Sequence, residues 1–298
     1  MSGFGLLLGL IALLWVARWS IRRGLAAPRV VEQHDPGSLG LLFRTVAFPT
    51  ANGRTLRGWF VPAQPTVAPA VMLLHGWGGN AETMLPLVGP LHRQGHAILL
   101  FDTRCHGMSD ADSFASLPDF AEDLEHALDW LRVQPGIDPQ RIAVIGHSVG
   151  AGAALLVASC STVIAAVVSI AAFAHPDVMM RRWLAGRHIP YWPVGWLILE
   201  YVQRVIGTRF ERIAPCNTIR RISCPVLLVH GTADTTVPVE EARLIHAHRA
   251  HDAVELLLIE GSHDEYADME AGIDAVTGFL GRRLQPQGDH HENPGQRH

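Results

Sequence analysis

Three polar side chains that together can break an acyl bond occur in this sequence in the order serine, aspartate, histidine. Ser148 is the centre of a Gly-His-Ser-Val-Gly string, Asp234 ends a Gly-Thr-Ala-Asp string, and His263 follows Gly-Ser. Each string comes directly after a short apolar run that is typical of a buried strand. In such a set the histidine takes the proton of the serine hydroxyl and the aspartate orients the histidine. The three residues are therefore predicted to form a catalytic triad.

The serine string predicts a tight turn between a strand and a helix. Residues 142–145 before it are apolar, and residues 151–154 after it (Ala-Gly-Ala-Ala) suit the start of a helix. A serine on such a turn has strained backbone geometry, and the flanking glycines lack the Cβ atoms that would clash there. The string alone is weak evidence, and the alternative is an ordinary turn whose serine caps the helix.

Position in the chain selects His263 and Asp234 from their rivals. The sequence has 17 histidines, and His263 is preferred because it lies after the last strand-like run and before the last helix. His147 is interpreted as a packing residue, because a side chain next to the serine should point away from its Oγ. Asp264 and Asp177 remain alternative acids, although a neighbour in sequence rarely reaches back to the preceding ring.

Two backbone N–H groups are expected to form an oxyanion hole. Val149, directly after the serine, would supply the first. The second is expected in residues 75–80 (His-Gly-Trp-Gly-Gly-Asn), where we choose Trp77. The glycines of this segment allow its backbone to approach a substrate, and the alternative is a glycine-rich turn that binds no ligand.

These strings resemble the α/β-hydrolase superfamily, and within it the esterase, lipase and serine-aminopeptidase-like group, from about residue 43 to residue 284. Residues 102–109 (Asp-Thr-Arg-Cys-His-Gly-Met-Ser) are similar to the Asp-x-Arg-Gly-His-Gly-x-Ser turn of the family, with Cys105 in place of a glycine. The resemblance implies an α/β fold: a mostly parallel sheet with an antiparallel N-terminal hairpin, helices on both faces and a helical cap insertion. It implies no cofactor. A serine nucleophile argues against the epoxide hydrolase and haloalkane dehalogenase branches, which use an aspartate there.

The apolar pattern predicts the strands of this sheet. Residues 41–48 and 55–61 alternate around Asn-Gly, which is a hairpin signal. Continuous runs, as expected of parallel strands covered on both faces, occupy residues 70–74, 97–101, 142–146, 165–171, 226–230 and 254–259. Helical patterns lie between them, notably at residues 119–133 and 239–249, and the last helix is expected at about residues 265–284.

Composition and domain organisation support one sizeable catalytic domain. Of the 298 residues 48% are hydrophobic, and the net charge of −4 gives no reason to expect a nucleic-acid partner. The four cysteines form no C-x-x-C pair, so they are interpreted as small hydrophobes or free thiols, and no metal site is predicted. The hydrolase domain is expected at residues 40–284, with a cap at 174–214 and a disordered tail at 285–298.

The cap region is rich in aromatic residues, which include Trp183, Tyr191, Trp192, Trp196 and Tyr201. We expect them to line an acyl pocket. Packing of the cap onto the core and contact with a membrane remain the alternatives.

The N-terminus predicts a membrane anchor over residues 1–23. Residues 3–17 are uncharged and apolar, and as a helix they would be about 22 Å long, somewhat short of the ~30 Å hydrocarbon core of a bilayer. Arg18, Arg22 and Arg23 follow, so the positive-inside rule places the catalytic domain in the cytoplasm. The helix is expected to tether the enzyme without joining its core. A cleavable signal peptide and a packed helix remain the alternatives.

The sequence therefore predicts a serine hydrolase that cleaves carboxylic ester or thioester bonds of small acyl substrates through an acyl-enzyme on Ser148. A serine peptidase that acts on short peptides is the alternative within enzymes. A non-catalytic, membrane-linked binding protein on the same fold is the alternative of another class. The intact triad argues against it, because a binding protein does not need the strained turn.

Overall fold

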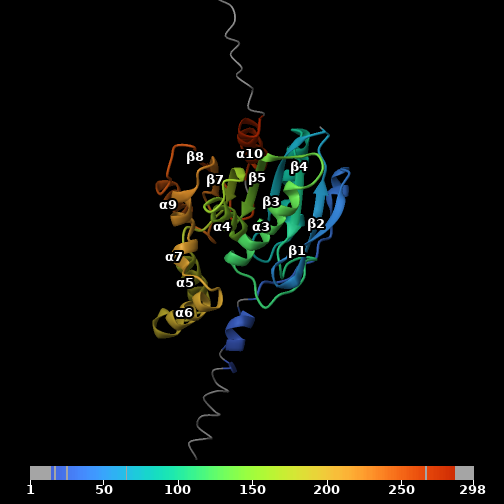
Figure 1. Ribbon diagram of the computed structural model, residues 1–298. Coiled ribbons are helices and arrows are strands. Elements are labelled where there is room, and N and C mark those ends of the chain that lie inside the picture. Colours follow the sequence, from blue (N-terminus) through green and yellow to red (C-terminus); the bar gives the residue numbers. More distant parts are fainter. Residues whose placement is uncertain (1–14, 17, 25, 65, 266, 286–298) are drawn as a thin grey trace, which may run out of the picture.

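A single twisted sheet forms the centre of the molecule (Figure 1). The computed structural model describes residues 15–16, 18–24, 26–64, 66–265 and 267–285. Within them the sheet has eight strands in the order β1-β2-β4-β3-β5-β6-β7-β8. The strands are β1 (Arg44–Thr50), β2 (Arg54–Val61), β3 (Ala68–Leu74), β4 (Ala97–Asp102), β5 (Ile137–His147), β6 (Ile164–Ile170), β7 (Val226–Gly231) and β8 (Val254–Ile259).

The predicted mixture of strand directions is confirmed. The β1–β2 and β2–β4 pairs are antiparallel, and all other neighbouring pairs are parallel. The hairpin turns through the 3-10 segment η2 (Ala51–Gly53), where Asn52 has φ 57° and Gly53 has φ 64°. Asparagine and glycine tolerate this left-handed backbone better than other residues, which is why Asn-Gly marks the turn in the sequence.

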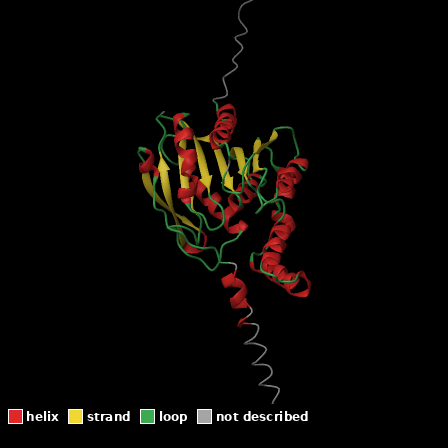
Figure 2. Ribbon diagram, turned by 180° about the vertical axis from the view of Figure 1, so that it is seen from behind, coloured by secondary structure: helices red, strands yellow, loops and turns green. Residues whose placement is uncertain are grey.

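Helices cover both faces of the sheet (Figure 2). Side chains of α3 and α4 pack on one face, and side chains of α2 and α10 pack on the other. The main helices are α2 (Leu85–Arg93), α3 (Leu117–Arg132), α4 (Val149–Ala158), α5 (Pro176–Gly186), α6 (Trp196–Val205), α7 (Phe210–Ile213), α8 (Pro215–Thr218), α9 (Val239–Ala247) and α10 (Met269–Arg283). The parallel strands are apolar on both faces because both faces are covered.

Capping residues explain where two of these helices begin. Ser116 caps α3 by accepting a hydrogen bond from the backbone of Asp119, and a proline occupies the first turn. Asp268 caps α10 in the same way, so this helix begins a few residues after the expected position. Both helices bury one apolar face, which in α3 includes Phe120, Leu124 and Leu131.

Helices α5 to α7 lie between β6 and β7 in the chain and project from the sheet beside the carboxyl ends of its strands (Figure 1). They have an apolar cluster of their own, which includes Leu184, Leu199 and Phe210 and joins the body at Leu117 and Val237. The helical group therefore stands over the edge of the sheet where the polar loops meet.

The predicted membrane localisation is wrong. In the part of the chain that the structure describes, no helix has both the length and the apolar character needed to cross a bilayer. Residues 3–14 and 17 of the apolar stretch lie outside that part. The described helical residues 18–24 include three arginines, and Arg22 Nε donates a hydrogen bond to Tyr201 Oη in α6 at 3.3 Å. The expectation of a cytoplasmic orientation depended on the same anchor and is withdrawn with it. Residues 286–298 of the predicted tail also lie outside the described residues.

The turn between β5 and α4 packs so closely on β3 that the backbones of the two segments are in contact. A Cβ atom at Gly150 would overlap the carbonyl groups of Leu74 and His75 at the end of β3, and one at Gly146 would overlap the backbone of Gly150 itself. The glycines on both sides of Ser148 are therefore required by close packing of backbone on backbone.

We predict that Gly150→Ala lowers the free energy of unfolding by about 1–3 kcal/mol, because the added methyl group meets fixed backbone atoms. Urea denaturation monitored by circular dichroism measures the change. Gly186→Ala at the end of α5 is the matched control, because nothing lies within 4 Å of its Cβ position. Equal unfolding midpoints for the two variants would contradict the packing argument.

Candidate active site

The three loops bring Ser148, His263 and Asp234 into one hydrogen-bonded chain. Ser148 Oγ lies 3.1 Å from His263 Nε2, and His263 Nδ1 lies 2.7 Å from Asp234 Oδ2. In the tautomer that satisfies both contacts, the hydroxyl donates to Nε2 and the Nδ1–H group donates to the carboxylate. This is the geometry in which a histidine can accept the serine proton while its other nitrogen is held.

The backbone of Ser148 has the strain that the sequence predicted. Its φ is 53° and its ψ is −114°, a region that a residue with a Cβ atom rarely adopts. The conformation is held because Ser148 N–H donates to Ile170 O in β6 at 2.8 Å and the next residue begins α4. Ser148 is only 8% exposed, and its hydroxyl lies at the N-terminus of a helix.

Asp234, and neither of its rivals, contacts the imidazole of His263. Asp234 Oδ1 accepts hydrogen bonds from the backbone N–H groups of Thr236 and Val237 at 2.8 and 2.7 Å. These contacts leave Oδ2 directed at the ring. Asp264 is largely exposed, and Asp177 forms an ion pair with Arg181 on α5. At the end of β7, His230 Nε2 also lies 3.4 Å from Asp234 Oδ2. The sequence did not indicate this contact.

The two N–H groups expected to form an oxyanion hole are available. Among the described residues, neither Trp77 N–H nor Val149 N–H donates a hydrogen bond, and both residues line the same cavity as Ser148. Val149 is the first residue of α4, and the first N–H groups of a helix have no partner within it. The cavity that Ser148 lines therefore has two backbone N–H groups that make no hydrogen bond to the described residues.

Two buried histidines hold the loop that contains Trp77. Gly78 N–H donates to His106 Nε2 at 3.2 Å, and Thr103 N–H donates to His75 Nε2 at 3.1 Å. Burial lowers the pKa of His75 to about 3, and burial also lowers the pKa of His106. Both rings are thus neutral acceptors at neutral pH. Their partners are distant in the chain, so no local pattern in the sequence indicated these contacts.

The turn at residues 102–109 ties this loop to the N-terminal segment. Asp102 accepts hydrogen bonds from the backbone N–H groups of Ala81 at 2.8 Å and Met108 at 2.9 Å. The Glu32 carboxylate lies beside it, since a Cβ atom at Gly107 would overlap both carboxyl groups. Burial, followed by the contact with Glu32, raises the pKa of Asp102 to about 8. Asp102 therefore keeps a proton at neutral pH, and no pattern in the sequence indicated its contact with Glu32.

Cys105 occupies the position where the resembling family has glycine, and its φ is 67°. The left-handed conformation that favours glycine is therefore retained with a cysteine in place. Its Sγ accepts a hydrogen bond from Asp112 N–H at 3.2 Å.

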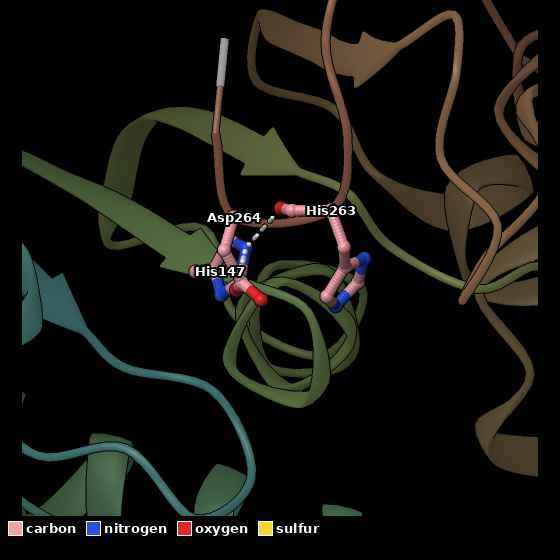
Figure 3. A group of neighbouring side chains, drawn as sticks. All are labelled: His147, His263 and Asp264. Carbon is pink, nitrogen blue, oxygen red and sulfur yellow. Dashed lines mark hydrogen bonds and ion pairs between the residues drawn. The ribbon is translucent and has the colours of Figure 1, made fainter.

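His147 contacts the backbone of the loop that contains His263. Its Nε2 donates to the carbonyl oxygen of His263 at 3.0 Å (Figure 3). The centres of the His147 and His263 rings lie 5.0 Å apart. The side chain thus points away from the serine hydroxyl, as expected, and supports the loop. His147, His263 and Asp264 could each offer one ligand atom to a metal ion. However, both ring nitrogens of His263 are already engaged by Ser148 and Asp234, so a metal ion here would break the serine–histidine–aspartate chain.

A cavity of about 650 Å³ opens above Ser148. Its volume suits a ligand much larger than an acetyl group. Apolar side chains that line it include Leu117, Phe173, Met179, Trp183, Phe210 and Ile213. Two of the five cap aromatics, Trp183 and Tyr201, line the cavity, whereas Tyr191, Trp192 and Trp196 are outside its lining and exposed.

Comparisons with known proteins agree with this architecture. The family model described as serine aminopeptidase, S33, matches residues 65–212. An uncharacterized protein of Mycobacterium tuberculosis is 28% identical over 275 residues, which are 91% of this chain and 90% of that protein. A polyketide transferase of Aspergillus fumigatus is 33% identical over 194 residues, which are 55% of this chain and 66% of the transferase. Among solved structures, the Pyrococcus furiosus esterase Pf2001 has a TM-score of 0.71 and 26% identity, and covers 88% of this chain and 98% of its own.

We predict that the fold becomes less stable as the pH rises, because the folded protein favours the protonated form of Asp102 beside Glu32. The pKa of Asp102 is raised from 3.8 to about 8 in the folded protein. The folded state therefore holds one more proton than the unfolded state between these values. The stabilisation is full below the lower value and is lost steadily as the pH rises from about 4 through about 8. A one-proton difference corresponds to about 1.4 kcal/mol per pH unit.

Glu32→Gln removes one of the two carboxylates, so it should lower the pKa of Asp102 and flatten this slope between pH 6.5 and pH 8. Urea unfolding at several pH values in that window measures it. Glu82→Gln is the control, because hydrogen bonds to Gln33 and His34 hold the pKa of Glu82 below its usual value. An equally steep slope in Glu32→Gln and the unmodified protein would show that Glu32 does not contribute to the raised pKa of Asp102, and no slope in the unmodified protein would show that Asp102 holds no extra proton.

Proposed function

Because this chain is a hydrolase of the α/β-hydrolase superfamily, we propose that it cleaves carboxylic ester or thioester bonds of small-molecule acyl substrates. The observation that carries the proposal is the continuous contact from Ser148 Oγ through His263 to Asp234 at the base of an apolar cavity. An apolar cavity fits an acyl chain, and the serine at its base fits the carbonyl carbon at the end of that chain.

The reaction has two halves. His263 Nε2 takes the proton of Ser148 as Oγ attacks the carbonyl carbon, and the N–H groups of Trp77 and Val149 donate to the negative oxygen that forms. The tetrahedral intermediate collapses as His263 gives its proton to the leaving alcohol or thiol. Water then attacks the acyl-enzyme by the same route and releases the acid. Asp234 holds the ring and stabilises its positive charge in both halves.

The cavity lining favours an ester over a peptide. An enzyme that holds the free ammonium group of a peptide needs an acidic partner for it. Of the described residues around the cavity, Asp264 is the one carboxylate, and its side chain is 78% exposed. Arg22 and Arg187 line the cavity instead and would repel an ammonium group. Cleavage of short peptides is therefore the weaker candidate.

A fluorophosphonate probe should label the unmodified protein and should leave Ser148→Ala unlabelled, because the probe reacts only with an activated serine. Mass spectrometry of the labelled protein locates the adduct. Ser169→Ala, which changes a buried serine of β6, is the control and should label normally. Equal labelling of Ser148→Ala and the unmodified protein would remove Ser148 as the nucleophile.

Asp234→Asn should lower kcat on a short p-nitrophenyl ester by about 10³–10⁴-fold, because the neutral amide no longer holds the required tautomer of His263. Asp264→Asn is the matched control, since it changes the neighbouring rival in the same way, and should retain most of the activity. Steady-state kinetics at pH 7.5 measure both variants. The reverse ranking would assign the orienting acid to Asp264.

A further inference from the structure

The N-terminal arm, which we define as residues 18–24 and 26–35, reaches from the cap to the loops beside Ser148. Its helical part lies at the same end of the molecule as α5 and α6 (Figures 1 and 2). There Arg22 Nε donates to Tyr201 Oη at 3.3 Å, and the guanidinium of Arg18 lies 5.6 Å from the centre of the Tyr201 ring. These contacts place the beginning of the arm against the cap.

The other end of the arm is held on the loops of the catalytic site. A Cβ atom at Gly78 would lie 2.7 Å from Pro28 Cγ, so the arm lies directly on the glycine loop that follows β3. Asn80 Nδ2 donates to Val30 O at 3.1 Å, and Arg29 Nε donates to Gly107 O at 2.8 Å. The arm is therefore attached to both sides of the opening between the cap and the body.

Between these attachments the arm lines the cavity above Ser148. The lining includes Ile21, Gly24, Ala26 and Pro28 of the arm together with the cap residues Val202 and Ile206. Ile21 is half-buried, whereas the other described residues of its helix are exposed. Among the described residues of this short helix, Ile21 is the one partly covered side chain, and it borders an apolar cavity. It is therefore placed to contact an apolar ligand.

We propose that the arm is a wall of the acyl-binding site and selects substrates with a long apolar acyl group. This inference rests on the proposed function. An acetyl group would fill only the space next to Ser148, whereas a chain of roughly eight to twelve carbons would extend through a cavity of about 650 Å³ and meet Ile21. Each methylene buried there strengthens binding about fourfold, so contact of two methylenes with the arm corresponds to about fifteenfold selectivity.

The test compares two phosphonate probes, p-nitrophenyl ethylphosphonate and p-nitrophenyl dodecylphosphonate. Each phosphonylates the serine Oγ, releases p-nitrophenol and is not turned over. Ile21→Trp should fill the distal cavity, and Ile21→Asp should place a charge in its apolar wall. Both variants should react about fifteenfold more slowly with the dodecyl probe and within about twofold of the unmodified protein with the ethyl probe. Ser20→Trp and Ser20→Asp make the same changes one residue away on an exposed position and should leave both rates unchanged.

The outcomes separate this inference from the proposed function. If the ethyl probe fails to label Ser148 in the unmodified protein, the proposed function is wrong and the inference is lost with it. If the ethyl probe labels Ser148 and the ratio of the two rates is the same in the Ile21 variants, the Ser20 variants and the unmodified protein, the arm is not a wall of the site. A loss confined to the dodecyl probe and to the Ile21 variants supports it.

Discussion

The approach of α4 to the end of β3 is the constraint on which the rest of the site depends. Because Gly150 has no Cβ atom, the turn between β5 and α4 can lie against the backbone at the end of β3, and because Gly146 has none, the turn can close on Gly150. Ser148 lies between these two glycines with a φ of 53°, and it lines the cavity. The same contact brings the loop after β3, with Trp77, next to the first N–H group of α4. One backbone contact thus sets both the nucleophile and the donors around it.

The surroundings of this contact are polar but hold little charge. The neutral rings of His75 and His106 accept backbone hydrogen bonds, and the Asp102 carboxyl keeps a proton beside Glu32. Burial favours the neutral form of each group, and neutral partners can hold the glycine loop without placing a net charge beside the serine. The N-terminal arm completes this network, so the position of the loop depends on a segment that is far from it in sequence.

The sequence predicts those parts of the molecule that local patterns determine. Continuous apolar runs located the strands, since parallel strands buried on both faces have no polar alternation. The Asn-Gly turn located the hairpin, and the strand-end position of Ser148, Asp234 and His263 indicated that they would meet, because parallel strands bring their carboxyl ends to one edge.

The sequence does not predict contacts between segments that are distant in the chain. The bonds from Gly78 to His106 and from Asn80 to Val30 follow from the folded arrangement of loops, and no spacing indicates them. The N-terminus shows the same limit. Hydropathy measures the apolar content of a segment but not what covers it, and it predicted an anchor where the described residues 18–24 contact the cap and line the cavity.

Rapid-quench kinetics with a p-nitrophenyl ester tests the central claim, an acyl-enzyme on Ser148, most directly. If the acyl-enzyme forms faster than water releases it, the first turnover should release about one equivalent of p-nitrophenol per protein, and acid-quenched protein should have the acyl group on the peptide that contains Ser148. An ester whose acyl group is slow to leave the enzyme makes hydrolysis of the acyl-enzyme the rate-limiting step. Turnover of that ester with no acyl group on Ser148, or with the acyl group on another residue, would contradict the account.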